Sequence, residues 1–449
     1  MLTKSREYDH DLAKNWSSVQ QKGMLLVLPV PLLVKGNQLF LESQACNGLE
    51  QWADNFESVI VAAPVLPEAQ ATQEKTKTMT WRDTATLAKP HRFEFVPLPS
   101  AYSPAKFFSC YGSVRASLGE LISRCRYLQF AIGGLFGDWA AVAALEAHKQ
   151  GRAYSIHTDR VEHEVILRSR QGAKLKTRLK SRILAPLIAS YHKQIIKNCS
   201  LGLWHGQDCY SAYSPFCENS HLIHDIHTKP SDCISNLELL QKAQRAKSDE
   251  TIRICYAGRI DPMKAPLDWV KAIARARDLG VKLHATWMGD GPLMQDMQAL
   301  IAEMGLNSVI ELTGFESDRT KLFEKIGESH LMLFTHVTPE SPRCLIESLV
   351  RGTPIIGYHS EYAADLVNDL GGGMFVPVED WEQLGNLIAK LSNDRKRLST
   401  LIEEAGKNGA RFNDQAVFRE RSELIKKHLS EAEKVSMKYE VLNYSTPLA

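Results

Sequence analysis

The sequence predicts an α/β protein built from two Rossmann-like domains, each a doubly wound parallel sheet, which face each other across a cleft. Two observations predict this fold class. Short apolar runs alternate with amphipathic segments of ten or more residues along most of the chain, and this alternation is typical of βαβ units in a parallel sheet. The length of 449 residues is enough for two large domains or three smaller ones.

The alternation is most regular after residue 250. Strands are predicted at 252–256, 283–288, 308–312, 331–334, 353–356 and 374–376, and helices after the first, second and last of them. Leu267, Val270 and Ile273 illustrate the helical spacing, and Gly280 ends that pattern. These residues form the predicted second domain, 250–411.

The first half alternates less cleanly. Strands are predicted at 25–30, 58–63, 93–97, 128–132, 153–157 and 201–204, and helices at 39–52, 138–149 and 236–247. We assign residues 1–235 to the first domain. The charged helical segment 412–449 is expected to pack back on it.

Composition and charge exclude several classes of protein. Lysine and arginine total 54 against 52 acidic residues, a net charge of +2, which argues against a nucleic-acid binder. The nine cysteines show no CxxC spacing, so a disulfide framework or a zinc ribbon is not expected. We expect the protein to occupy a reducing compartment. The start lacks the apolar core of a signal peptide, and no apolar run is long enough for a membrane span. We expect a cytoplasmic protein.

Two loops of the second half carry groups suited to phosphate binding. Gly258 and Arg259 follow a predicted strand, and Lys264 lies just before the next helix. Arginine offers a planar fork and lysine a point charge, which together suit a phosphate. Two solvated surface charges are the alternative, and the favoured one for this pair alone.

The segment 338–347 joins a predicted strand to a helix. Ser341 is expected as the N-cap and Pro342 as the first helical residue, so that free N–H groups of the helix face the cleft and suit a diphosphate. Glu340 and Glu347 would then accept hydrogen bonds from a sugar and a ribose. A capped surface helix with two solvated glutamates explains the segment equally well.

Two further segments have both a functional and a structural interpretation. Gly289 opens a glycine-rich turn that would let a ligand approach the backbone, although a plain strand-to-helix turn is the simpler reading. Phe315 follows the next predicted strand and could stack on a base, although such a phenylalanine more often lies in a core.

Together these motifs resemble the donor half of a GT-B glycosyltransferase, specifically of family 4. The resemblance covers 252–410 and rests on Gly258-Arg259…Lys264, Gly289-Asp290-Gly291-Pro292, Gly314-Phe315, Glu340…Glu347 and Gly352-Thr353-Pro354-Ile355-Ile356. It implies that Arg259 and Lys264 hold a donor diphosphate, that Glu340 contacts the donor sugar and that Glu347 holds the ribose. The implied donor-binding set also includes Gly36, Gly258, Gly289, Phe315, Ser341, Pro342, Arg343, Cys344 and Leu345. One residue fewer separates the two glutamates than in the family, so the assignment of Glu347 is the safer one.

The first half resembles the family more weakly. Lys35-Gly36-Asn37 follows the first strand, where the family often has two glycines. His157 ends a predicted strand and matches a family histidine near the reacting centre, with Asp159 as the residue that could orient it. Asp138, after Gly133-Gly134, is expected to border the acceptor. A structural histidine is the alternative for His157.

A basic stretch is the last feature. Seven cations and no acid occur between 168 and 182, and leucines and isoleucines follow. Such a helix can lie on an anionic membrane surface, and a solvated helix face is the equal alternative. The cations are Arg168, Arg170, Lys174, Lys176, Arg178, Lys180 and Arg182.

The sequence thus predicts an enzyme that transfers a hexose-type sugar from a nucleoside-diphosphate sugar to a glycan or lipid-linked acceptor, as in surface polysaccharide or glycolipid synthesis. The resemblance implies retention at the anomeric carbon and no obligatory metal or other cofactor. The expected partners are the donor, the acceptor and an anionic membrane surface, and not nucleic acid. A nucleotide-sugar epimerase on the same scaffold and a non-catalytic two-domain binding protein remain as alternatives.

Overall fold

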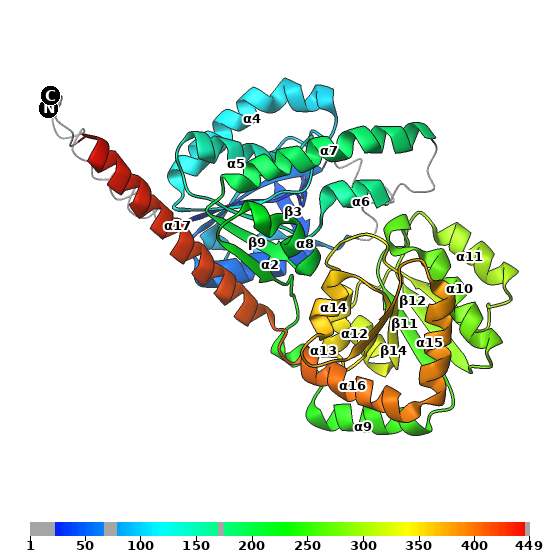
Figure 1. The fold of residues 1–449 in the computed structure, drawn as a ribbon. Coiled ribbons are helices and arrows are strands. Elements are labelled where there is room, and N and C mark those ends of the chain that lie inside the picture. Colours follow the sequence, from blue (N-terminus) through cyan, green and yellow to red (C-terminus); the bar gives the residue numbers. More distant parts are fainter. Residues whose placement is uncertain (1–22, 67–78, 169–174, 445–449) are drawn as a thin grey trace.

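The computed structural model describes residues 23–66, 79–168 and 175–444, and it has the predicted fold class, two α/β domains with parallel sheets. Figure 1 shows the first domain, with the blue to green strands, above the second, with the green to orange helices. The cleft between them lies at the carboxyl edges of both sheets, where ligands of such folds bind.

The first sheet has the order β10-β9-β8-β7-β1-β4-β2-β3-β5, and β6 pairs with β4. Pairing is parallel from β10 through β4 and β6, and antiparallel in β2–β3–β5. The strands are β1 Met24–Val27, β2 Leu32–Lys35, β3 Gln38–Glu42, β4 Val59–Leu66, β5 Trp81–Asp83, β6 Phe93–Leu98, β7 Tyr127–Ala131, β8 Ser155–Thr158, β9 Leu201–His205 and β10 Ser220–Ile223.

Helices cover both faces of this sheet because its central strands are apolar on both sides. In β1, Leu25 and Val27 pack under α4 and α5, whereas Met24 and Leu26 pack under α2 and α17. The helices of this domain are α2 Ser43–Asn55, α4 Pro104–Arg124, α5 Trp139–Lys149, α6 Glu162–Arg168, α7 Leu175–Lys197 and α8 Gln207–Tyr213.

The predicted helix 39–52 is wrong at its start. Residues 38–42 form β3, which pairs with β2 and β5, and the helix α2 begins only at Ser43. Glu42 caps α2 by accepting a hydrogen bond from the Ala45 N–H at 2.9 Å.

The second sheet has the all-parallel order β13-β12-β11-β14-β15-β16, which is the Rossmann order, reversing between its first and fourth strands. Its strands are β11 Ile252–Ala257, β12 Leu283–Met288, β13 Ile310–Gly314, β14 Leu331–Phe334, β15 Ile355–Tyr358 and β16 Gly373–Val376. Its helices are α9 Asn236–Ser248, α10 Pro266–Asp278, α11 Met294–Glu303, α12 Arg319–Glu328, α13 Arg343–Val350, α14 Glu361–Val367, α15 Trp381–Asn393 and α16 Arg395–Gly409.

Two connections join the domains and cross at one point. The outward connection passes Thr228, and the return connection leads into α17 (Asp414–Tyr444), which lies along α2 and β9 of the first domain (Figure 1). Thr228 Oγ1 donates to the Phe412 carbonyl at 2.9 Å, and the Asp414 N–H donates to the Thr228 carbonyl at 2.9 Å.

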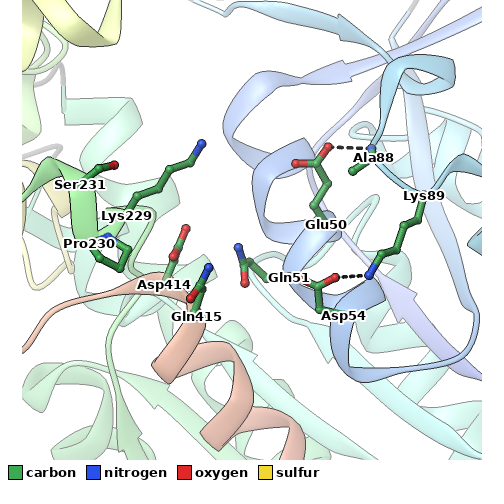
Figure 2. A pocket seen from close by; sticks show the side chains of 10 residues that line it. All are labelled: Glu50, Gln51, Asp54, Ala88, Lys89, Lys229, Pro230, Ser231, Asp414 and Gln415. Atoms are coloured by element: carbon green, nitrogen blue, oxygen red, sulfur yellow. Dashed lines mark hydrogen bonds and ion pairs between the residues drawn. The ribbon is translucent and has the colours of Figure 1, made fainter.

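A polar groove of about 460 Å³ lies beside this crossing. Figure 2 shows Lys229 and Asp414 on one side of it and the side chains of α2 on the other. Lys89 pairs with Asp54 at 2.5 Å on the α2 side, and no drawn interaction joins the two walls.

Candidate active site

The predicted donor residues converge where the order of the second sheet reverses. Lys264 follows β11 and Glu340 follows β14, the two strands that flank this point. Their Nζ and Oε1 atoms are 2.6 Å apart, and each side chain is only 12% exposed. His336 Nδ1 lies 3.6 Å from the same carboxylate oxygen, and Tyr256 and His336 share a hydrogen bond of 2.6 Å. The sequence motifs therefore form one buried polar cluster.

Local backbone contacts hold Lys264 in this position. Asp261 caps a short 3₁₀ turn, accepting from the Met263 N–H at 3.0 Å, and Thr335 Oγ1 donates to the Lys264 carbonyl at 2.7 Å. Ala265, directly after it, has a φ of +41°. A non-glycine residue in this left-handed region is strained, and such strain is common at functional sites.

Arg259 is placed differently from Lys264. Its side chain is 51% exposed, and the ion pair that the structure gives it, to Asp261, is long at 4.0 Å. The guanidinium can therefore reach toward a ligand at the mouth of the cleft without first breaking a strong internal pair.

The glycines of the 289–292 turn serve packing between loops. A Cβ on Gly289 would lie 1.9 Å from the Gly258 carbonyl oxygen, and one on Gly291 would lie 2.3 Å from the Ile260 carbonyl oxygen. The structure thus gives Gly289 a packing role, close approach of the Gly258–Ile260 backbone, and its predicted contact with a ligand stays a prediction. Through this contact Gly289 positions Gly258 and Arg259.

The start of α13 differs from the prediction. The helix begins at Arg343 with Pro342 in the N-cap position, and Ser341 does not cap it. Ser341 Oγ instead donates to the His205 carbonyl of the first domain, because the extended segment 339–341 runs along that domain. The Leu345 side chain is fully buried in the core, and its N–H donates to the Pro342 carbonyl at 3.2 Å. Its predicted contact with the donor stays a prediction.

The two residues before Leu345 differ in their surroundings. Burial raises the pKa of the Cys344 thiol to about 12, so this cysteine is a neutral thiol at physiological pH. Arg343 Nε lies 3.6 Å from Asp225 Oδ2, an ion pair that bridges the two domains.

Glu347 is buried, and an arginine that the sequence analysis missed holds it. Arg319 Nη1 donates to Glu347 Oε1 at 3.0 Å, and its Nη2 donates to the His227 carbonyl at 3.0 Å. Arg319 thereby ties α12, α13 and the interdomain connection together. Its position at the start of α12 gives no sequence signal for this role, since its partner lies 28 residues away.

Phe315 is 43% exposed, directly after β13. Gly314 before it has a φ of +75°, which turns the chain outward. An aromatic ring is therefore available at the edge of the sheet, and its role as a platform for a base stays a prediction.

In the first domain, His157 ends β8 and lines the cleft. Its hydrogen-bond partner is Gln129 of β7, through Nδ1, and not Asp159 as predicted. The Ser155 hydroxyl holds the amide oxygen of Gln129, so the amide nitrogen donates to Nδ1 and the ring proton resides on Nε2. Burial lowers the pKa of His157 well below its usual value, with a further contribution from Arg421, so the ring is neutral. Gln129 is fully buried, and its sequence position alone gave no signal for this contact.

Asp138 lies beside the cleft as expected and its contact with an acceptor stays a prediction, whereas the placement of Gly36 needs correction. Asp138 lines the cleft, but its oxygens accept from the N–H groups of Gly133, Gly134 and Ala141 at 2.9–3.0 Å, so it shapes the loop and caps α5. Gly36 lies in the β2–β3 hairpin turn with a φ of +57° and is not among the residues that line the cavity. The loop directly after β1, at Leu28 to Val30, takes that place because β1 ends earlier than predicted.

The cavity at the carboxyl edge of the first sheet has a volume of about 630 Å³, within the usual range for ligand sites. His157, Asp159, Arg160 and Arg343 are among its walls. The Glu340 loop closes against it: the Ser341 N–H donates to the Asp159 carbonyl at 3.1 Å, and Arg160 and Glu340 form an antiparallel bridge.

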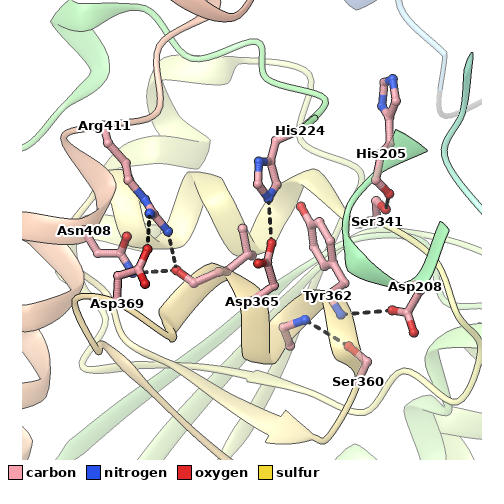
Figure 3. Close-up of polar contacts among 12 residues, drawn as sticks. His205, Asp208, His224, Ser341, Ser360, Tyr362, Asp365, Asp369, Asn408 and Arg411 are labelled. Atoms are coloured by element: carbon pink, nitrogen blue, oxygen red, sulfur yellow. Dashed lines mark hydrogen bonds and ion pairs between the residues drawn. The ribbon is translucent and has the colours of Figure 1, made fainter. Parts of the chain in front are cut away.

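Further contacts hold the two domains together beside the cleft. Figure 3 shows the Tyr362 N–H donating to Asp208, at 3.0 Å, and His224 paired with Asp365, at 3.2 Å. His205 and Ser341 lie next to these pairs in the same view. Helix α14 of the second domain therefore also contacts the first domain beside the cleft.

The predicted basic stretch is divided between two helices. Arg168 ends α6 and pairs with Glu164 at 2.8 Å, whereas Arg178, Lys180 and Arg182 are exposed on α7. Arg170 and Lys174 lie outside the described residues, as does the side chain of Lys176. On α7, Leu179, Ile183 and Leu187 are 59, 61 and 56% exposed.

The described part of the chain contains neither a cluster of metal-ligating side chains nor a membrane-spanning helix. No group of three or more metal-ligating side chains occurs in residues 23–66, 79–168 and 175–444. No helix within those same ranges is long and apolar enough to cross a bilayer.

Residues 239–408 match the family model described as glycosyl transferases group 1. The match covers the second domain, where Arg259, Lys264, Glu340 and Glu347 lie.

Sequence relatives match part of the chain. The protein named as a colanic acid biosynthesis glycosyltransferase, WcaL, of Salmonella typhimurium is 25% identical over 164 residues, 35% of this chain and 40% of the relative. A Campylobacter jejuni N-acetylgalactosamine-N,N'-diacetylbacillosaminyl-diphospho-undecaprenol 4-alpha-N-acetylgalactosaminyltransferase is 25% identical over 202 residues, 43% of this chain and 52% of the relative. The chain thus spans about half or less of the length of these relatives.

Solved structures share the whole fold. The Anabaena protein Alr3699/HepE, solved in complex with UDP and glucose, superposes with a TM-score of 0.59 at 15% identity, covering 92% of this chain and all of that one. The GT-B architecture of two domains and a cleft therefore extends over both halves of the chain.

Proposed function

We propose that the protein is a glycosyltransferase that moves a sugar from a nucleoside-diphosphate sugar to a glycan or lipid-linked acceptor, as in family 4. The observation that carries this proposal is the convergence of Lys264 and Glu340, 2.6 Å apart, at the reversal point of the second sheet. The loop of Glu340 pairs with residues 159–161, which directly follow β8, the strand of His157. The family match and the relatives support the same activity.

The residues divide the chemistry among them. Arg259 and Lys264 stabilise the negative charge that develops on the leaving diphosphate, and fixed cations do this without reorganisation. Glu340 orients a donor-sugar hydroxyl. The carboxylate oxygen of Glu347 that Arg319 does not bind accepts a hydrogen bond from the ribose. Neutral His157 presents an Nε2–H donor to the sugar. We further propose retention at the anomeric carbon and a reaction that needs no metal, because lysine and arginine supply the positive charge.

Nucleotide binding tests the donor site. The melting temperature of the full chain is measured with UDP, GDP, ADP and CMP, with and without EDTA. One nucleoside diphosphate should raise the melting temperature equally with and without EDTA. At 100 times its dissociation constant it adds about 2.7 kcal/mol to the free energy of unfolding. Lys264→Ala and Glu347→Ala should lose the shift, and exposed Lys407→Ala should keep it. A folded protein that responds to no nucleotide would reject the proposal.

We also propose that α7 lies on the inner face of a membrane, from which a lipid-linked acceptor is taken. Leu179, Ile183 and Leu187 recur every fourth residue and form an exposed apolar stripe beside Arg178, Lys180 and Arg182. This combination is typical of interfacial helices, in which each cation adds about 1 kcal/mol on an anionic surface. The Campylobacter relative is named for a diphospho-undecaprenol substrate.

Vesicle sedimentation tests this placement. The protein should sediment with phosphatidylglycerol vesicles and not with phosphatidylcholine vesicles. Leu179→Ser with Ile183→Ser should abolish sedimentation, whereas Leu237→Ser with Leu240→Ser, also exposed but on α9, should not. Equal behaviour of the two double variants would contradict the proposal.

A further inference from the structure

A buried arginine without a partner lines the cavity of the first domain. Arg421 of α17 is 3% exposed, and its Nε is buried without a hydrogen-bond partner. Its guanidinium lies 4.9 Å from the Trp52 ring and 5.0 Å from the Phe418 ring. In the part of the chain that the structure describes, no hydrogen bond or ion pair to Arg421 is formed.

This arrangement leaves a positive charge incompletely compensated. Burial lowers the pKa of Arg421 to about 10, so the side chain still carries its charge at neutral pH. A buried charge without a partner is strongly destabilising. Asp225 also lines the cavity, but its carboxylate pairs with His227 at 3.4 Å and with Arg343 at 3.6 Å. The two rings offset only part of the lost hydration, because a cation–π contact is weaker than the hydration that burial removes.

Further hydrogen-bonding groups without partners lie beside Arg421 in the lining of the cavity. Both ring nitrogens of His205 are buried without partners, and the ring stacks on His157 with centroids 5.4 Å apart. His205 is neutral because burial, followed by Arg421, lowers its pKa to about 3, so it offers one N–H donor. The wall thus combines a charged planar fork with a neutral donor, from α17 and the end of β9. Arginine forks of this kind match the oxygens of phosphate and carboxylate groups.

We propose that Arg421, together with His205, forms an oxyanion subsite that binds a phosphate or carboxylate of the acceptor. The proposal rests on the proposed function and extends it: the acceptor is acidic. The subsite belongs to the first domain, whereas Arg259 and Lys264 of the second domain serve the donor diphosphate. The acidic group is held beside His157, whose ring stacks on His205.

The test uses the full chain with and without the nucleoside diphosphate found to bind. Inorganic phosphate, glucose 1-phosphate and glucuronate are titrated by calorimetry, with glucose as the neutral control. In the presence of saturating nucleotide, at least one anion should bind saturably and glucose should not. Arg421→Gln should weaken that binding at least tenfold, and exposed Arg419→Gln on the same helix should leave it unchanged. Preference among the three probes separates phosphate from carboxylate chemistry.

A lipid arm separates a lipid headgroup from a soluble acceptor. Sedimentation with phosphatidylcholine vesicles that contain a polyprenyl phosphate is compared with sedimentation with plain phosphatidylcholine vesicles. A dependence on the lipid phosphate that Arg421→Gln removes assigns the subsite to a lipid-linked acceptor. Binding of the soluble anions alone assigns it to a soluble one, and either result supports the subsite.

Three results would overturn the subsite. The first is a wild-type protein that binds nucleotide but none of the anions or the lipid phosphate. The second is an Arg421→Gln variant that binds the anions as well as wild type does. The third is an Arg421→Gln variant that loses nucleotide affinity, which would assign the guanidinium to the donor. A wild type that binds no nucleotide refutes the proposed function instead. If Arg421→Gln does not fold, Arg421→Lys and His205→Gln answer the same questions.

Discussion

A methyl group at position 289 tests whether loop packing positions the donor site. In Gly289→Ala, the new Cβ would lie 1.9 Å from the Gly258 carbonyl oxygen and 3.2 Å from Trp287 Nε1. Restoring even a tight contact of 3.0 Å moves the Gly258 backbone by about 1.1 Å and strains the 2.9 Å hydrogen bond from Trp287 to that carbonyl. Overpacking of this kind is destabilising by about 1–3 kcal/mol. Arg259, the next residue, moves with the backbone, and a misplacement of about 1 Å can lower activity about 100-fold.

The assay combines calorimetric melting of the full chain with the kcat/KM of sugar transfer. We expect Gly289→Ala to melt several degrees lower, at about 2–4 °C per kcal/mol for a domain of this size. Gly112→Ala is the matched control, because no atom lies within 4 Å of its Cβ position in the middle of α4. It should be neutral or stabilising by about 0.5–1 kcal/mol. If Gly289→Ala melted and turned over like wild type, the packing account of this turn would be refuted.

Three further predictions concern buried polar groups. Burial lowers the pKa of Lys242 to about 7, so from pH 7 to about 10 the unfolded chain binds more protons and stability rises with pH. Relative to Lys242→Met, wild type should gain about 1.4 kcal/mol per pH unit over that window in urea unfolding, while exposed Lys247→Met should track wild type; a pH-independent difference would contradict this. Arg319→Met removes the 3.0 Å bond to Glu347 and should weaken nucleoside-diphosphate binding about tenfold by calorimetry, a charged hydrogen bond contributing about 1.5–3 kcal/mol; unchanged affinity would show that the pair is dispensable. In Gln129→Glu the new carboxylate accepts a hydrogen bond from Nδ1–H of His157 and raises the pKa of that ring, so the pH profile of kcat should shift upward with nucleotide affinity unchanged. An unshifted profile would deny Gln129 its positioning role.

The second domain was predictable from the sequence because its central strands are buried apolar runs. Residues 283–288 were predicted as a strand and form β12 with the same bounds. The hairpin of the first domain was not predictable in this way. Residues 38–42 read as the start of a helix, yet their pairing with Trp81–Asp83, some forty residues away, makes them a strand. A long-range partner overrode the local pattern.

The residues of the candidate site also differ in how far the sequence alone predicts them. Lys264 and Glu340 carried local signals, since each lies in the loop between a strand and the helix that follows it. Gln129 and Arg421 act through contacts that only the folded chain brings together. Arg421 sits in a charged helix where nothing in the pattern separates it from exposed neighbours such as Arg419, and only its burial marks it.

The crossing of the two connections at Thr228 and Phe412 has a mechanical consequence. A rotation that opens the cleft would turn about this point and would break the interdomain contacts beside the cleft, such as the ion pair of Arg343 and Asp225. Helix α17 would move with the first domain, which it packs on, although it follows the second domain in the sequence. Arg421 would then stay at the cavity of the first domain, and the distance between Arg343 and Asp225 would report how far the cleft has opened.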